Sequence, residues 1–177
     1  MTGVYSVGID WGSGTGNDFT DISVFNDKKQ QVDLFYFNDL TPQEQIETIE
    51  QNLQKYYPTK RRGESLSILV DMNSIGRIYY NLLQEKLGSH WGVSISGFTT
   101  TNETKRKIIE NMQVEIQNSG ISLLPDTEQS IQLSSYEIES TSTGKITFNA
   151  STGRHDDIVI SNSLALYNLK ANNYVII

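Results

Sequence analysis

Carboxylates at the ends of apolar runs are the chemically distinctive feature of this sequence. Asp10 and Asp71 each end an apolar run, and Asp156 and Asp157 open the last apolar stretch. A carboxylate at the end of a buried strand is costly unless a charged or polar group meets it there. The three points can converge if the fold brings strand ends together. Carboxylate oxygens are the ligands that Mg²⁺ and Mn²⁺ prefer, so the pattern predicts a divalent-cation site.

Such a site is suited to phosphodiester hydrolysis. The charge of a phosphodiester repels nucleophiles, and two cations about 3.5–4 Å apart can activate water and stabilise the departing oxygen. We expect Asp10, at the centre of the sheet, to bridge two Mg²⁺ or Mn²⁺ ions. Asp71 would bind one ion, and Asp156 or Asp157 the other. Adjacent helical residues point about 100° apart, so the two do not coordinate one ion equally, and we favour Asp157 as the direct and catalytic ligand with Asp156 as its near neighbour.

Simpler structural explanations exist for the same residues. Aspartates near strand ends are commonly turn residues or helix caps, and Asp156 and Asp157 at a helix start favour the helix dipole whatever the function. Asp18 and Asp21, in the glycine-rich loop, are most simply turn residues. Asp18 remains an auxiliary candidate because the loop could carry it to the metal region. His155 is a second auxiliary candidate, although a lone histidine is more often a packed or exposed side chain.

The charge balance bears on a nucleic-acid partner. A formal net charge of −7 argues against one, but bound cations would cancel some of the acids locally. Basic residues also occur in clusters, and local patches decide where a polyanion binds. The candidate residues for binding a nucleic acid are Lys105, Arg106, Lys60, Arg61 and Arg62. The alternative is that both clusters are solvated surface.

Length and composition indicate one globular domain over residues 1–177. No apolar run approaches the ~20 residues of a membrane span, and no secretory signal precedes the first strand. The absence of cysteine excludes disulfides and thiolate metal sites. We expect no membrane segment, and the lack of cysteine is compatible with a cytoplasmic protein.

The order of the expected elements indicates the fold class. Strands are expected at Val4–Ile9, Asp21–Phe25, Val32–Phe37, Leu66–Val70 and Val93–Phe98. Helices are expected from Thr41 to Pro58, over Ile78–Leu87, from Thr100 to Asn118, over Glu128–Leu133 and from Asp156 or Asp157 onward. A β-hairpin of Tyr136–Ser140 and Lys145–Asn149 precedes the last helix. This is the order of an α/β ribonuclease-H-like domain, a mixed sheet with antiparallel first three strands and helices on both faces. There the first and fourth strands are neighbours, which would place Asp10 beside Asp71, facing the start of the last helix.

These motifs resemble the nuclease domain of the large subunit of tailed-phage terminases, the DNA-packaging motors. The resemblance rests on Gly8–Gly12 with Asp18 downstream, on Val70–Gly76, and on Gly153–Val159 after the hairpin. It implies an endonuclease that cuts concatemeric double-stranded DNA with two Mg²⁺ or Mn²⁺ ions.

The resemblance gives the ligand roles to Asp10, Asp71 and Asp157. It further implies an ATPase domain, a small terminase subunit and a portal as partners in the full system. No G-x-x-x-x-G-K-[ST] loop is found, so we expect the ATPase domain to be absent from this chain and Met1 to start an excised domain.

Three alternatives stay open. Another ribonuclease-H-like nuclease, such as a junction resolvase, would share the site and differ in substrate. The segment Gly8–Thr15 also resembles the first phosphate loop of actin-like ATPases and sugar kinases, which need two related lobes. A third alternative is a nuclease-like fold that only binds DNA or a viral partner.

Overall fold

The computed structural model describes residues 3–12, 18–140, 146–150 and 156–172, with the backbone alone for 137–140, 146–150 and 172. The main sheet comprises β1 (Val4–Asp10), β2 (Thr20–Asn26), β3 (Gln31–Phe37), β4 (Ser65–Asp71) and β5 (Val93–Phe98). The helices are α1 (Pro42–Leu53), the 3₁₀ helix η1 (Gln54–Tyr56), α2 (Gly76–Leu87), α3 (Asn102–Gln117), α4 (Thr127–Ser135) and α5 (Asp157–Asn172). A separate ribbon comprises β6 (Tyr136–Ser140) and β7 (Ile146–Ala150).

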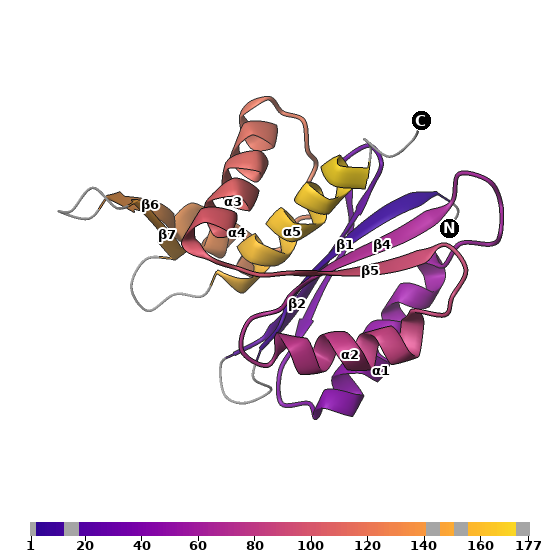
Figure 1. The fold of residues 1–177 in the computed structure, drawn as a ribbon. Coiled ribbons are helices and arrows are strands. Elements are labelled where there is room, and N and C mark those ends of the chain that lie inside the picture. The colour runs from indigo at the N-terminus through magenta and orange to yellow at the C-terminus, as the bar shows by residue number, and fades with distance from the viewer. Residues whose placement is uncertain (1–2, 13–17, 141–145, 151–155, 173–177) are drawn as a thin grey trace.

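The central sheet has the predicted topology. Its strand order is β3-β2-β1-β4-β5, with β1–β2 and β2–β3 antiparallel and β1–β4 and β4–β5 parallel. The first and fourth strands are therefore neighbours, and the ribonuclease-H-like fold class is confirmed. Figure 1 shows α1 and α2 on one side of this sheet and α3 and α5 on the other.

The alternation of side chains along β1 explains why helices pack on both faces of the sheet. Val7 and Ile9 are buried in one apolar cluster with residues of α1 and α2 such as Ile49 and Leu83. Because successive strand residues point to opposite faces, Gly8 lies on the α5 side. A strand that buries both faces reads as a nearly continuous apolar run, as the sequence of β1 does.

Small residues let α5 approach β1 closely. A Cβ atom at Gly8 would overlap with the Ser161 carbonyl oxygen and the Ala165 nitrogen. The Ser6 hydroxyl donates a hydrogen bond of 2.7 Å to the Ala165 carbonyl, and the Ser23 and Ser161 hydroxyls are hydrogen-bonded at 2.9 Å. These contacts fix α5 across β1 and β2, antiparallel to β1, so the start of α5 lies where β1 ends.

The start of α1 agrees with the prediction from the sequence, and the start of α3 differs from it. The capping box predicted at Thr41 is present. The start of α3 was expected at Thr100, but Thr101 is the N-cap, and its side chain accepts from the Thr104 backbone. The reason is that the Thr100 hydroxyl donates to Asp71 instead, at 2.7 Å.

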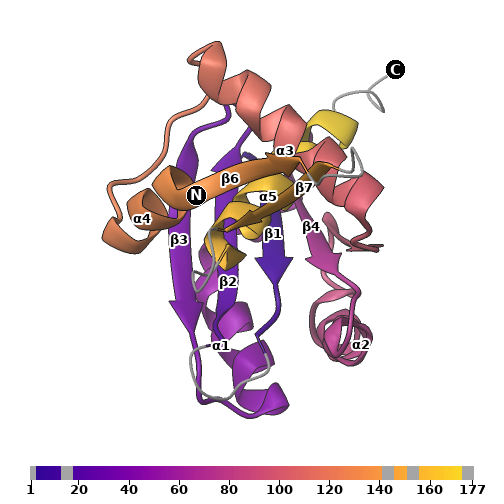
Figure 2. The same ribbon diagram turned by 90° about the vertical axis from the view of Figure 1, so that its left-hand side faces the viewer.

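The β6–β7 ribbon matches the predicted hairpin, with its second strand one residue later than expected. Tyr136 pairs with Ala150 at the base of the ribbon. In Figure 1 the ribbon projects away from the main sheet beyond α3 and α4, and in Figure 2 it crosses in front of α5. No helix among the described residues is long and apolar enough to cross a membrane.

Candidate metal centre

The sheet register brings three aspartates to one edge. Ile9 pairs with Val70 in the parallel β1–β4 ladder, so the next residues, Asp10 and Asp71, end neighbouring strands at the same edge. Asp10 pairs directly with Asp21 in the antiparallel β1–β2 ladder. Directly opposed residues project from the same face of a sheet. The three side chains therefore share the face that α5 covers.

Helix α5 brings the remaining acids to this edge. It begins at Asp157, and the Ile158 backbone amide donates to the Gln132 side chain of α4 at 2.9 Å. Asp156 lies just before the helix, and its carbonyl accepts the amide of Ile160. The sequence thus predicted correctly that the start of the last helix meets the ends of β1 and β4.

The other acids lie close enough to raise the pKa of Asp10 and of Asp21. Burial raises the pKa of Asp10 well above its ordinary value, and Asp157, Asp71, Asp21 and Asp156 raise it further, in that order of size. Burial also raises the pKa of Asp21 to about 8, with Asp157 as the largest charged contributor. Carboxylates that repel one another in this way are stabilised by protonation or by a cation.

Two of the acids are held by neighbouring residues. The Asp71 carboxylate accepts the Thr100 hydroxyl, and the Asn73 side chain donates to the Thr100 carbonyl at 2.7 Å. The Asp156 carboxylate forms an ion pair of 2.8 Å with Lys105 of α3. In the part of the chain that the structure describes, no three His, Cys, Asp or Glu side chains are grouped closely enough to hold a metal ion. The acids thus share one neighbourhood without converging on a single point.

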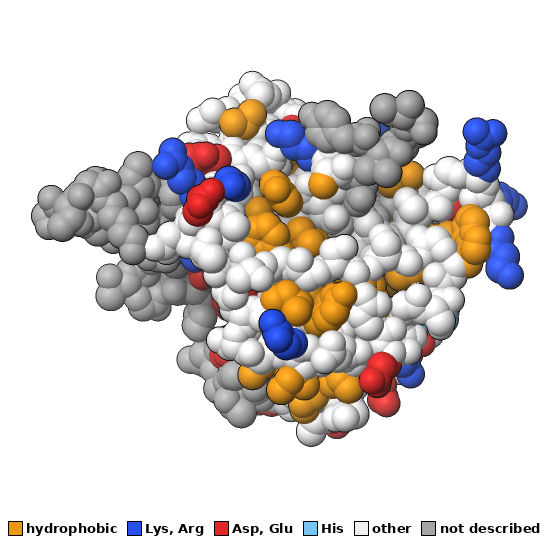
Figure 3. All heavy atoms as spheres, viewed as in Figure 1, with side chains coloured by type: hydrophobic (Ala, Val, Ile, Leu, Met, Phe, Trp, Pro, Cys, Tyr) orange, Lys and Arg blue, Asp and Glu red, His pale blue; other side chains and the backbone are white. Residues whose placement is uncertain are grey.

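The basic cluster on α3 divides into two kinds of residue. Lys105 has a side chain only 20% exposed and pairs with Asp156. It therefore lies at the edge of the sheet where β1 and β4 end, which we call the acidic edge. Arg106 pairs with Glu110, and Lys107 pairs with Glu103, within the exposed surface of α3. Figure 3 shows Lys and Arg side chains in several separate groups on this side of the molecule.

The second basic cluster lies far from the acids. Lys60, Arg61 and Arg62 are exposed and precede β4, whereas Asp71 ends that strand. A strand of seven residues spans on the order of 20 Å. These three residues, which the sequence predicts to bind DNA, therefore lie at the opposite end of the sheet from the acidic edge.

Of the two auxiliary candidates, the structure describes Asp18 alone. Asp18 is close enough to Asp21 to contribute to the rise of its pKa. His155 lies outside the described residues, as do residues 13–17 of the glycine-rich loop.

Sequence reasoning missed the position of Asp21 among the acids. It interpreted Asp21 as a turn residue, but Asp21 lies within β2, is 1% exposed and faces Asp10. Asp126 and Glu128, at the start of α4, also contribute to raising the pKa of Asp21 and were not expected there. An acid that opens an otherwise apolar strand was the one available signal, and it needed the strand register to be interpreted.

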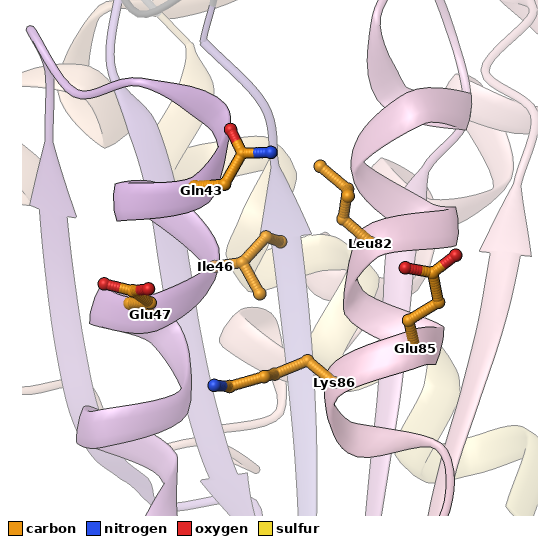
Figure 4. Close-up of a pocket in the computed structure, with 6 residues that line it drawn as sticks. All are labelled: Gln43, Ile46, Glu47, Leu82, Glu85 and Lys86. Carbon is orange, nitrogen blue, oxygen red and sulfur yellow. The ribbon is translucent and has the colours of Figure 1, made fainter.

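A groove on the other face of the sheet is distinct from this edge. It lies between α1 and α2, as Figure 4 shows, and is lined by Gln43, Ile46, Glu47, Leu82, Glu85 and Lys86. Lys86 pairs with Glu50 beside it. None of the acids at the ends of β1 and β4 lines the groove, so it is not part of the candidate metal centre.

Comparisons with known proteins identify the fold. The chain is similar to the large terminase nuclease of thermophilic phage G20c, with a TM-score of 0.77 and 20% identity over 93% of this chain and 81% of that one. Structures of that nuclease with cobalt (TM-score 0.77, 20% identity) and with magnesium (TM-score 0.75, 19% identity) each match over 93% of this chain and 80% of theirs.

Two further solved structures are similar to the chain. The large terminase nuclease domain of a Thermus phage, P74-26, has a TM-score of 0.71 and 21% identity, over 92% of this chain and 77% of that one. The fowlpox virus resolvase in complex with Holliday junction DNA has a TM-score of 0.51 and 12% identity, over 97% of this chain and 99% of that one. No protein-family model and no curated protein sequence matches. The chain therefore has the ribonuclease-H-like fold of the large terminase nuclease domains.

Proposed function

We propose that the chain is a divalent-metal-dependent endonuclease of the terminase type, which cuts double-stranded viral DNA. The observation that supports this most is the gathering of Asp10, Asp71 and Asp157 at one sheet edge, in the fold of nucleases that were solved with magnesium and with cobalt. Hard carboxylate oxygens are the expected ligands for Mg²⁺ or Mn²⁺.

The residues present suit such cations chemically. Asp10 experiences unfavourable charge from four other aspartates, and a cation among them would turn this repulsion into attraction. Metal binding would bring these side chains closer together, because no three of the described ones are grouped closely enough to hold a metal ion. When bound, two cations would activate water and stabilise the departing oxygen of a phosphodiester.

The chain's own residues divide the remaining tasks. Asp10 and Asp71, at the ends of rigid paired strands, hold fixed positions, and Asp157 joins them from the start of α5. The Thr100 hydroxyl orients the Asp71 carboxylate. Lys105 places a positive charge beside the acids, where a DNA phosphate needs one.

The same proposal includes the biological setting. The DNA would be a concatemer cut during genome packaging, in the host cytoplasm. An ATPase domain, a small terminase subunit and a portal would act together with this nuclease. The large terminase nucleases that share the fold support this setting.

The test is plasmid cleavage by the purified chain. We expect nicking and linearisation with Mn²⁺ or Mg²⁺ and none with EDTA. Asp10→Ala should abolish cutting while the protein stays folded, since removing one of several crowded acids relieves repulsion. Asp27→Ala, in the exposed turn between β2 and β3, is the matched control and should cut normally. Normal cutting by Asp10→Ala would contradict the proposal.

A junction resolvase is the second candidate, because the fowlpox virus enzyme shares the fold. The two candidates differ in substrate preference. A resolvase should cut a four-way junction at far lower enzyme concentration than linear duplex of the same sequence. The terminase proposal predicts comparable cutting of both.

A further inference from the structure

Asp21 is a buried carboxylate on β2, next to Asp10 at the acidic edge, and no role was assigned to it above. Its residue is 1% exposed, and it pairs directly with Asp10 across the β1–β2 ladder. Two residues along β2, the Ser23 hydroxyl contacts Ser161 of α5. Because alternate residues of a strand share a face, Asp21 projects to the same α5 side as Ser23. The start of α5 lies over that position.

One oxygen of Asp21 lacks a hydrogen bond. Its Oδ2 atom is buried and accepts none from the residues that the structure describes. The neighbouring buried polar residues differ. The Thr20 hydroxyl donates to Gln45 at 2.8 Å, and the Gln31 side chain donates to Asn162 at 2.8 Å. A buried polar atom without a partner destabilises the fold, so the unsatisfied carboxylate oxygen of Asp21 points to a bound partner.

The acids around Asp21 favour a cation as the partner of this oxygen. Asp157, Glu128, Asp126 and Asp18 all act on it with the same sign. A hydrogen bond to this oxygen would need a donor. The charged side chains that act on Asp21 are carboxylates, which accept hydrogen bonds. A divalent cation satisfies a carboxylate oxygen and the surrounding negative charge together.

We propose that Asp21 is a further carboxylate ligand of the cation site, acting beside Asp10 from the neighbouring strand. This inference rests on the proposed function, because the cation is the one that Asp10, Asp71 and Asp157 would hold. It extends the ligand set from the ends of β1 and β4 to the start of β2.

The experiment measures Mn²⁺ binding to the full chain by isothermal titration calorimetry, without DNA. Asp21→Asn keeps the shape of the side chain and removes its charge, and we expect its Mn²⁺ affinity to fall at least tenfold. Loss of even an outer-shell partner of a metal site commonly costs about 10–100-fold in affinity. Asp27→Asn makes the same chemical change in an exposed turn and should bind Mn²⁺ as the wild type does.

Circular dichroism establishes that each variant is folded, and Asp21→Ser provides a second replacement should Asp21→Asn fold poorly. Wild-type Mn²⁺ affinity in a folded Asp21→Asn or Asp21→Ser variant overturns the inference and leaves the proposed function standing. A wild type that binds Mn²⁺ but cuts no DNA overturns the proposed function alone. A wild type that binds no Mn²⁺ overturns both.

Discussion

The Lys105 ammonium group lies 2.8 Å from the Asp156 carboxylate, and this ion pair joins the first turns of α3 to the residue before α5. Both side chains are about four-fifths buried, with 20% and 24% of their areas exposed. The pair between Lys107 and Glu103 has a similar separation, 2.8 Å, but its side chains are 57% and 79% exposed. Two lysines on one helix therefore have different electrostatic roles.

Lys105→Ala should destabilise the metal-free protein by about 1–3 kcal/mol. The substitution leaves Asp156 without this counter-charge beside several other acids, and breaking a partly buried pair costs more than breaking an exposed one. Lys107→Ala, the matched control, should cost less than about 0.5 kcal/mol. Urea unfolding in EDTA measures both.

A double-mutant cycle with Asp156→Asn isolates the pair. We expect Lys105→Ala to cost much less in the Asp156→Asn background than in the wild type. Equal costs in the two backgrounds would show that Lys105 stabilises the protein through other contacts.

The residues of the acidic edge and of α3 show what the sequence could and could not predict. Asp10 and Asp71 end two apolar runs, and the order of elements makes those runs neighbouring strands. Their proximity was therefore predictable. The different roles of Lys105 and Arg106 were not, because three consecutive basic residues look equivalent in sequence. The packing of α3 against α5 decides which one reaches Asp156.

Asp21 illustrates a second limit. Its position opposite Asp10 depends on the register of β1 and β2, and a slip of one residue would turn Asp21 to the other face of the sheet. That register depends on burial along both strands. The start of α3 shows the same dependence, because Thr100 and Thr101 are equivalent as caps until Asp71 accepts a hydrogen bond from Thr100.

The metal-free protein should lose stability as pH rises from about 4 to about 8. The pKa of Asp21 is about 8 in the folded protein, against an ordinary value of 3.8. Between these values the folded state retains a proton that the unfolded state has released, so unfolding becomes more favourable with each increase in pH. Burial and nearby acids raise the pKa of Asp10 in the same direction. Urea unfolding in EDTA across this pH range measures the decline.

Asp21→Asn should make that decline shallower, because it removes one of the groups whose pKa is raised. At pH 8 the variant should be more stable than the wild type in EDTA, and at pH 4 the two should differ little. An identical pH dependence in both proteins would mean that Asp21 ionises at its ordinary pKa.

Gly8→Ala should destabilise the fold by about 3 kcal/mol or more and weaken Mn²⁺ binding. The added methyl group would overlap with backbone atoms of Ser161 and Ala165, so α5 must move away from β1. Asp157 moves with that helix. Gly120→Ala is the control, because the atom nearest to its new methyl group is the end of the flexible Glu115 side chain. Thermal unfolding and calorimetry with Mn²⁺ test the pair, and equal melting temperatures would contradict the close helix–strand contact.

Thr100 and Thr101 offer a test of whether orientation of Asp71 matters to metal binding. Thr100→Val removes the hydroxyl that donates to Asp71, and we expect Mn²⁺ affinity to fall about tenfold, as is common for outer-shell partners of metal ligands. Thr101→Val removes the N-cap of α3 instead and should cost about 1 kcal/mol of stability without changing Mn²⁺ affinity.

Thr100→Ser restores the hydroxyl on a smaller side chain and should recover wild-type Mn²⁺ binding. DNA affinity in EDTA should be the same in all three variants, because the hydroxyl acts through Asp71 and not on DNA. A positioning role for Thr100 therefore requires that Mn²⁺ affinity fall in Thr100→Val, which lacks the hydroxyl, and return in Thr100→Ser, which has it. If Thr100→Val and Thr101→Val lower stability equally and leave Mn²⁺ affinity unchanged, the hydrogen bond to Asp71 serves the loop between β5 and α3 alone.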